Sequence, residues 1–327
     1  PGERAITVQG TSAASPFTNI TIADCPISLW GMYGVCMEFV QGFTVRGCTL
    51  TAIGYAAVNG LSVSQGMICD NLIDGVSASL SGNGYGIAVS RRTDAGELDV
   101  RPHSADILIT GNIVRNIPGW EGLDTHGGQR IQFVDNQVYN CRLAIAVGSS
   151  KDGSGTYVYG PQDIVVAGNL CDSGVTDGSA SYGINVTGCP AQRATAVVSA
   201  NFVNGYGAEA DWISGAIHAY HTDGLIVANN VIHEPSPHGI HLYHHNYSAT
   251  VIGNTVTDAW SNTQTPATAV GLTNSNNSAL VAGNVLLHDS KSATHINDNG
   301  IRNSGGCTVR LGNNDFSAAT AYVGNGS

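Results

Sequence analysis

The chain has 327 residues, 42 of them glycine and only 11% charged, and its formal net charge is −11. This charge argues against nucleic acid and anionic membranes as partners, because both are polyanions, and no apolar stretch is long enough to span a bilayer. The chain begins at Pro1 without a methionine, so we expect that a leader or an upstream segment is missing.

A short phrase recurs along almost the whole chain: an alternating apolar run, a small or polar residue, an asparagine and another apolar residue. The asparagines of this phrase are Asn71, Asn112, Asn136, Asn169, Asn201, Asn230, Asn254, Asn284 and Asn314. Cys25 and Cys48 take the same place in two earlier phrases. A fixed phrase at variable spacing is typical of a solenoid whose insertions fall in loops.

Alternation with a period of two indicates strands with one buried face, and in most repeats a second strand follows the phrase without a helical pattern between them. The sequence therefore predicts an all-β, single-stranded parallel β-helix of about eleven coils. We expect one domain over 1–327, with a cap and first strand in 1–17 and coils in 18–327. Each asparagine is expected to take a left-handed bend and to bond its neighbour in an internal ladder.

Loop length varies along the predicted coils. Residues 18–66 form two coils with short loops, whereas long loops occur from the third coil to the ninth, and the last two coils are polar and plain. Long loops on a rigid scaffold usually border a site. The eight cysteines show no Cys-x-x-Cys spacing, so we expect buried thiols rather than a metal site or a disulfide framework.

The second strands align on an inward apolar residue at Ile87, Leu123, Ile145, Ile184, Ile217 and Ile240. The following outward column is Ala88, Asp124, Ala146, Asn185, His218 and His241, and the next is Ser90, His126, Gly148, Thr187, Tyr220 and Tyr243. Coils are stacked about 4.8 Å apart, so His218 should lie beside His241 and Tyr220 beside Tyr243. Asp124 should lie roughly 14 Å from His218, three coils away.

These columns carry acid–base groups and aromatic rings along a straight face, which is what a polysaccharide site needs. The predicted catalytic residues are Asp124, His126, Arg91, His218 and Tyr220. The predicted substrate-binding residues are Arg92, Trp120, Asn185, Asp152, Trp212, Asp211, His241, Tyr243 and His244.

Metal binding is not expected. The histidines of HGIHLYHH resemble a zinc site in composition, but alternation sends them in different directions. No acidic Gly-Gly-x-Gly-x-Asp repeat is present, so no calcium array is predicted. No cofactor is expected; a single Ca²⁺ ion is compatible with the sequence but not indicated by it.

The repeats resemble the right-handed parallel β-helix superfamily of pectate lyases, alginate-type epimerases and phage tailspike depolymerases. The segment EGLDTHGG is similar to the Asp-Pro-His signature of mannuronan C5-epimerases, with Asp124 and His126 at the matching positions and Thr125 in place of the proline. The resemblance implies that a histidine and a tyrosine handle the C5 proton while a cation neutralises the uronate carboxylate. Arg91 or Arg92 would be that cation. Glu121 stands where the family has a tyrosine, and Asn185 where it has an arginine two coils on.

The favoured function is a lyase or C5-epimerase acting on a uronate polysaccharide, with His126 as base, Asp124 orienting it and Tyr220 or Tyr243 as acid or stacking platform. A glycoside hydrolase or glycan transferase is an alternative, using Asp124 with Asp152 or Glu209 with Asp211 as paired carboxylates. A third is a non-catalytic glycan-binding tailspike or surface module, for which a homotrimer is considered. All three predict an extracellular location, secreted or on a virion.

Overall fold

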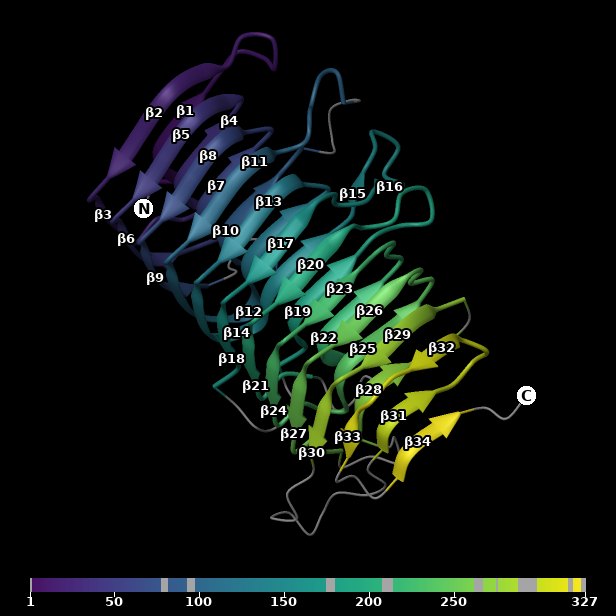
Figure 1. The fold of residues 1–327 in the computed structure, drawn as a ribbon. Coiled ribbons are helices and arrows are strands. Elements are labelled where there is room, and N and C mark those ends of the chain that lie inside the picture. The colour runs from purple at the N-terminus through teal and green to yellow at the C-terminus, as the bar shows by residue number, and fades with distance from the viewer. Residues whose placement is uncertain are drawn as a thin grey trace.

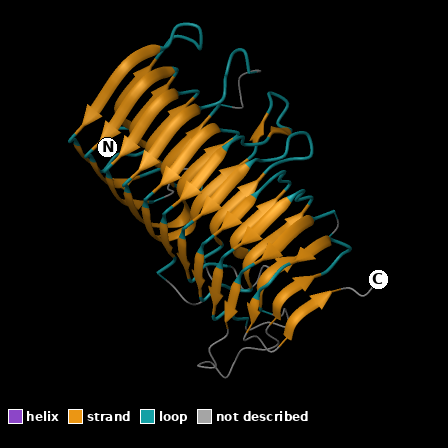
Figure 2. Ribbon diagram, viewed as in Figure 1, coloured by secondary structure: helices purple, strands orange, loops and turns teal. Residues whose placement is uncertain are grey.

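The computed structural model describes residues 2–77, 82–92, 98–174, 180–207, 214–261, 267–274, 276–287, 299–316 and 320–324. Within these residues the regular structure consists of strands, and they wind into one long solenoid (Figures 1 and 2). None of its described residues forms a helix that could cross a membrane. The predicted β-helix is confirmed.

Each coil presents up to three strands, and each kind of strand stacks into one face of the solenoid. The first face is an eleven-stranded parallel sheet, which agrees with the predicted coil number. Its strands are β2 (Phe17–Ala23), β5 (Val40–Arg46), β8 (Ser64–Cys69), β11 (Ala105–Thr110), β13 (Gln129–Val134), β17 (Ile164–Ala167), β20 (Ala196–Ser199), β23 (Ile226–Ala228), β26 (Ala249–Ile252), β29 (Ser278–Ala282) and β32 (Thr308–Leu311).

The second face follows the asparagine bend. It contains β3 (Pro26–Ser28), β6 (Thr49–Ile53), β9 (Leu72–Val76), the first part of β12 (Ile113–His126), the first part of β14 (Gln137–Gly148), β18 (Leu170–Asp172), β21 (Phe202–Asn204), β24 (Val231–His233), β27 (Thr255–Thr257), β30 (Val285–Leu287) and β33 (Asp315–Phe316). Because β12 and β14 continue around the corner, this face and the third form one 21-stranded sheet.

The third face carries the predicted functional columns. It contains β1 (Arg4–Gln9), β4 (Tyr33–Glu38), β7 (Ala56–Leu61), β10 (Tyr85–Ser90), the later parts of β12 and β14, β19 (Tyr182–Thr187), β22 (Gly215–Tyr220), β25 (His238–His244), β28 (Thr268–Leu272), β31 (Asn299–Asn303) and β34 (Thr320–Gly324). A two-stranded hairpin, β15 (Ser150–Lys151) and β16 (Tyr157–Tyr159), projects from the fifth coil (Figure 1).

The interior is a continuous column of branched aliphatic side chains. Ile87, Leu123 and Ile145 lie in register on three successive coils and are fully buried, as the alternation predicts. Burial of one such side chain contributes about 1.5 to 3 kcal/mol. Repetition of this layer in each coil stabilises the solenoid and fixes which residues point outward.

The asparagine ladder is continuous from Asn71 to Asn314. Each Nδ2 donates to the Oδ1 of the next asparagine at 2.9 to 3.0 Å. The left-handed bend, however, belongs to the residue before the asparagine, as at Asp70 (φ 55°) and Gly168 (φ 68°). Our assignment of the bend to the asparagine itself was therefore wrong. The asparagine does not have a positive φ, and its side-chain amide stabilises the corner by hydrogen bonding.

A second, shorter ladder lies at the corner between the third and first faces. Thr222 donates to Asn246 at 2.8 Å, Asn246 to Asn277 at 2.9 Å, and Asn277 contacts the sulfur of Cys307 at 3.3 Å. This ladder was not predicted, because its members do not share the recurring phrase. All eight cysteines are free, and all but Cys25 are buried.

Candidate active site

The third face aligns the predicted columns as expected from the alternation. Asp124 lies in register with Ala88 on one side and Ala146 on the other, and the column continues through Asn185 and His218 to His241. The outward direction of these side chains follows from the burial of Leu123 and its neighbours in the core.

A cavity of about 250 Å³ opens on the third face between the second and fifth coils. Three predicted site residues, Arg91, Asp124 and His126, line it. The remaining lining residues are Tyr55, Asn59, Leu61, Tyr85, Ala88, Ser90, Ser149, Ser150, Lys151 and Tyr157. We take this cavity as the candidate active site because it gathers acid–base groups, phenols and cations.

Two carboxyl groups and an imidazole converge at Asp124. Asp124 Oδ1 lies 3.2 Å from His126 Nε2, and Glu121 offers a ligand atom within 4.8 Å of both residues. Asp124 is 1% exposed and Glu121 5% exposed, whereas the side chain of His126 is 37% exposed. The imidazole is thus the member of the group that reaches solvent and an incoming ligand.

The electrostatics of the two carboxyls follow from their burial. Burial raises the pKa of Asp124 well above its usual range, and burial together with the nearby Asp124 charge raises that of Glu121. Ionisation of both buried carboxyl groups is unfavourable, because the two negative charges would repel each other at this distance. The group therefore retains a proton at pH values where free carboxyl groups have lost theirs.

The tautomer of His126 is set by its second nitrogen. Nδ1 lies 3.2 Å from the carbonyl oxygen of Ser149, which can only accept, so Nδ1 carries the proton. Nε2, beside Asp124, is then the nitrogen that gains or loses a proton. The ring lies over Gly148 of the next coil, where a Cβ would come within 2.6 Å of Nδ1.

Arg91 differs from its expected role as an open cation. It is buried, and its Nε and Nη1 donate to the carbonyl oxygens of Arg101 (2.8 Å) and Lys151 (2.6 Å). Its guanidinium lies 5.0 Å from the ring centroid of Tyr159. Arg91 therefore ties the 98–104 segment and the β15–β16 hairpin to the end of β10.

The neighbouring predicted residues lie at or beyond the rim of the cavity. Arg92 is exposed and lies 3.9 Å from the carboxylate of Glu38, so it approaches an internal acid. Trp120 lies on the irregular stretch of β12 before Glu121, with the guanidinium of Arg142 5.4 Å from its ring. Neither residue lines the cavity.

The hairpin supplies a lysine that the sequence analysis did not select. Lys151 lines the cavity, and its Nζ lies 4.8 Å from the ring centroid of Tyr157. Asp152 has a different role from the one predicted: its Oδ1 accepts the amides of Ser154 and Thr156 at 2.9 Å each and closes the hairpin turn. The hydrogen bond from the Ser154 hydroxyl, together with the Thr156 amide, lowers the pKa of Asp152.

The histidines of the seventh and eighth coils form a separate cluster. The ring centroids of His218 and His241 lie 5.5 Å apart, so the two residues are neighbours as expected, but the rings meet edge to face at 62° rather than stacked, and both side chains are buried. Nδ1 of His218 faces Oδ1 of Asn185 at 2.9 Å, and burial lowers the pKa of His218. Asn185, His218 and His241 do not line the cavity around Asp124.

The tyrosines of this cluster show a register change. Tyr220 pairs with His244 rather than with Tyr243, because the strands shift after Ala219, so the predicted backbone pairing was wrong. The rings of Tyr220 and Tyr243 still approach to 5.5 Å between centroids. The predicted Asp211 and Trp212, with the alternative carboxylate Glu209, lie outside the described residues.

Glu121, Asp124 and His126 are also the one set of at least three potential ligands that converges among the described residues. Two carboxylates and an imidazole fit a divalent ion such as Mn²⁺ or Zn²⁺ better than Ca²⁺, which prefers oxygen ligands. The absence of a metal requirement stays a prediction.

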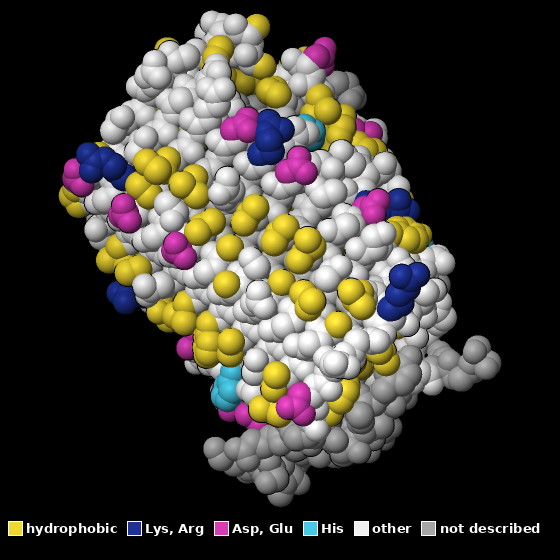
Figure 3. All heavy atoms as spheres, viewed as in Figure 1, with side chains coloured by type: hydrophobic (Ala, Val, Ile, Leu, Met, Phe, Trp, Pro, Cys, Tyr) yellow, Lys and Arg dark blue, Asp and Glu magenta, His cyan; other side chains and the backbone are white. Residues whose placement is uncertain are grey.

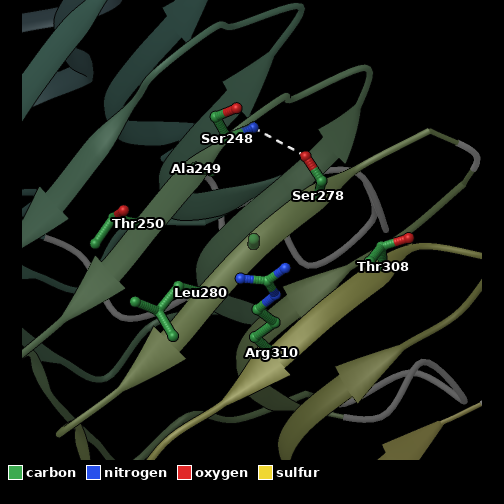
Figure 4. A pocket seen from close by; sticks show the side chains of 8 residues that line it. Ser248, Ala249, Thr250, Ser278, Leu280, Thr308 and Arg310 are labelled. Carbon is green, nitrogen blue, oxygen red and sulfur yellow. Dashed lines mark hydrogen bonds between the residues drawn. The ribbon is translucent and has the colours of Figure 1, made fainter.

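A second hollow, of about 350 Å³, lies on the first face. Ser248, Thr250, Ser278, Leu280 and Thr308 line it with Arg310, and the Ser248 amide donates to Ser278 at 2.9 Å (Figure 4). Neither a carboxylate nor an imidazole lines it. The surrounding surface is largely uncharged, with scattered apolar side chains (Figure 3). It offers little acid–base chemistry.

The predicted site residues did not include Tyr55, Tyr85 and Lys151, which line the cavity, or Glu121, which lies beside Asp124. Tyr85 and Glu121 are paired in register and, two positions before Ile87 and Leu123, alternation assigns them to the interior. However, Gly86 and Gly122 also face the interior, where a Cβ would meet the core side chains of Val114 and Val138, so the alternation breaks directly before Ile87 and Leu123. The one available signal was the pattern Glu-x-x-Asp-x-His.

The family model described as the right-handed β-helix region matches residues 3–153 and 78–256. No curated protein sequence matches the chain. Among solved structures, an alginate lyase from Paenibacillus sp. FPU-7 is 14% identical over 93% of this chain and 98% of its own, with a TM-score of 0.56. A periplasmic alginate epimerase is 13% identical over 96% and 78%, with a TM-score of 0.57. The A-module of a mannuronan C-5 epimerase from Azotobacter vinelandii is 11% identical over 100% and 91%, with a TM-score of 0.54.

Proposed function

Since the chain belongs to the right-handed β-helix family, we propose that it is a polysaccharide-modifying enzyme whose active site is the cavity at Asp124 and His126. The reaction we propose is removal of the proton next to the carboxylate of a uronate sugar. β-Elimination then gives a lyase, and reprotonation from the other side gives a C5-epimerase. An extracellular location follows from a polymeric substrate.

One observation carries the proposal: an imidazole with a defined tautomer reaches into a cavity that also contains Lys151 and Arg91. Proton removal from carbon next to a carboxylate needs a base and a cation that stabilises the developing charge. His126 Nε2 supplies the base, and Lys151, one of the two cations that line the cavity, stabilises the developing charge. Arg91 adds positive charge behind it.

The buried acids assist this chemistry. With raised pKa values, Glu121 and Asp124 repel an anionic sugar less than two ionised carboxylates would. The phenol of Tyr85 lines the same cavity, and burial and the two acids raise its pKa, so it remains a proton donor. This arrangement offsets locally the net charge of −11. Structural similarity to an alginate lyase, an alginate epimerase and a mannuronan C-5 epimerase favours the same substrate class.

Glycoside hydrolysis is a second candidate, favoured by the Glu121–Asp124 pair. Retaining glycosidases hold two carboxyl groups roughly 5 to 5.5 Å apart, and here ligand atoms of the two residues lie within 4.8 Å. The pair replaces the expected combination of Asp124 with Asp152, because Asp152 closes the hairpin turn instead. The other expected combination, Glu209 with Asp211, lies outside the described residues.

The test is incubation of the protein with alginate, polymannuronate, polygalacturonate and a neutral glucan in D₂O. Unsaturated ends indicate a lyase, and deuterium at C5 without cleavage indicates an epimerase. Reducing ends without unsaturation favour hydrolysis. His126→Ala should abolish the change, whereas Asp106→Asn should not, since Asp106 is an exposed carboxylate bonded to Arg130 on the first face. Absence of any change in all four polymers contradicts the proposal.

A further inference from the structure

Three tyrosines form a ladder that leads from the cavity toward the N-terminal end of the third face. The ring centroids of Tyr33 and Tyr55 lie 5.6 Å apart and those of Tyr55 and Tyr85 5.4 Å apart, with interplanar angles of 89° and 73°. Tyr55 and Tyr85 line the cavity, and Tyr33 continues their row one coil further. All three side chains are half-buried, so part of each remains open to solvent.

The ladder has the properties of a sugar-binding platform. Successive rings are spaced at nearly the coil repeat of about 4.8 Å. Burial raises the pKa of each phenol, which keeps the hydroxyls neutral and able to donate to a sugar or its carboxylate. Aromatic faces and a few polar groups along a trough are typical of carbohydrate recognition.

A cation stands at the far end of the ladder. The guanidinium of Arg4 lies 5.4 Å from the ring centroid of Tyr33, and Arg4 is exposed on β1. At the other end of the trough, Lys151 lines the cavity. An anionic polymer lying between them would meet a positive charge at both ends, although the chain as a whole is acidic.

The opposite direction along the face is less open at the cavity. The ring of His126 covers Gly148 on the fifth coil, and Lys151 and Tyr157 of the hairpin form the last part of the lining. The cavity thus extends toward the tyrosines and ends at the hairpin.

We propose that Tyr33, Tyr55 and Tyr85 bind successive sugars of a uronate chain, so that the polymer extends from Asp124 toward the first coil. The proposal rests on the proposed function and adds the direction of the chain and the length of substrate required. Short oligosaccharides occupy the cavity alone, whereas longer ones also reach Tyr33.

The experiment compares Tyr33→Ala with the parent protein on purified uronate oligosaccharides of increasing length and on polymer. We expect KM to rise about tenfold for long substrates, the loss of one aromatic contact, with kcat nearly unchanged. The shortest substrate that is turned over should show no change. Tyr33→Phe keeps the ring and should have a KM for long substrates close to that of the parent protein. This variant separates the contribution of ring stacking from that of the hydroxyl.

Tyr139→Ala is the matched control, because Tyr139 is a half-buried tyrosine on β14 of the second face, bonded to Gln137. It should leave the length dependence intact, and thermal melting should verify that both variants fold. If Tyr33→Ala and the parent protein turn over long substrates with equal KM, the proposed tyrosine platform is wrong, whereas the proposed function stands. A protein that changes none of the uronate polymers overturns both the platform and the proposed function.

Discussion

Nε2 of His126 lies 3.2 Å from Oδ1 of Asp124, on the same strand and two residues away. The strand alternation places both side chains on one face, and the Ser149 carbonyl fixes the ring from the other side. This geometry makes Asp124 a partner that sets the orientation and charge of a base. The imidazole is the more exposed of the two.

Replacement of either partner should reduce turnover by different amounts. We expect His126→Ala to lower kcat by roughly 10² to 10⁴, the usual contribution of a general base. Asp124→Asn retains the shape but not the charge, and should lower kcat less. Steady-state assays on the active polymer would measure both. Equal activity of His126→Ala and Asp106→Asn would exclude His126 as the base.

Stability should fall with rising pH because of Glu121. Its folded pKa is raised, so above the unfolded value of about 4.3 the native state binds more protons than the unfolded chain. The free energy of unfolding then decreases until the folded pKa is passed, by about 1.4 kcal/mol for each unit of elevation. Glu121→Gln should flatten this decrease in urea titrations across that range.

Asp106 serves as the comparison, because its pKa is lowered in the folded state whereas that of Glu121 is raised. Its hydrogen bond to Arg130 lowers its pKa, so its contribution is present above the unfolded value and lost as pH falls. Asp106→Asn should therefore weaken the protein slightly at neutral pH and leave the decrease at higher pH unchanged. An identical pH profile for Glu121→Gln and the parent protein would contradict the assigned burial effect.

Arg91 should act by holding the hairpin. Loss of its bonds to Arg101 and Lys151 in Arg91→Met should increase deuterium exchange in 150–159 and raise KM more than it lowers kcat. Added guanidinium should restore part of the activity. Arg115→Met removes an exposed arginine paired with Asp74 on the second face and serves as the control. Unchanged deuterium exchange in the hairpin of Arg91→Met would contradict the proposal that Arg91 holds the hairpin in place.

The middle of the asparagine ladder should be more sensitive than its end. Asn201→Ala would leave the Val166 carbonyl and the backbone amide of Asn169 without these partners and would remove one of the two donors to Asn230 Oδ1, and we expect a loss of roughly 2 to 4 kcal/mol. Asn314→Ala, at the partly exposed end, should cost about 1 kcal/mol. Chemical denaturation would compare them, and equal losses would argue against a cooperative ladder.

Activity should survive chelation. Treatment with EDTA followed by desalting should leave turnover unchanged within twofold, since the proposed chemistry uses Lys151 rather than an ion. Restoration of lost activity by Mn²⁺ or Zn²⁺ would instead assign Glu121, Asp124 and His126 to a metal.

The sequence predicted the fold well because each coil repeats the same local pattern. Alternation around Ile87, Leu123 and Ile145 determined the outward column, and the structure aligns it as expected. The recurring asparagine marked the ladder for the same reason. Long-range features outside the repeat, such as the Thr222–Asn246 ladder, gave no such signal.

The cavity was predicted only in part. Asp124 and His126 lie on one strand, so their proximity follows from local geometry. The direction of Arg91 and the position of Lys151 depend on how loops pack, which alternation does not determine. The predicted strip from Asp124 to Tyr243 is divided into a cavity and a buried histidine cluster, because the covering of His218 and His241 cannot be deduced from their strands.

The asparagine ladder also gives the solenoid a net dipole along its axis. Every Nδ2 from Asn71 to Asn284 donates toward the C-terminal neighbour, so the side-chain amide dipoles point the same way instead of cancelling. Aligned hydrogen-bonded amides polarise one another, and each bond in the row strengthens the next. The two ends of the solenoid are consequently inequivalent: one terminates the row on an acceptor, and the other on amide hydrogens.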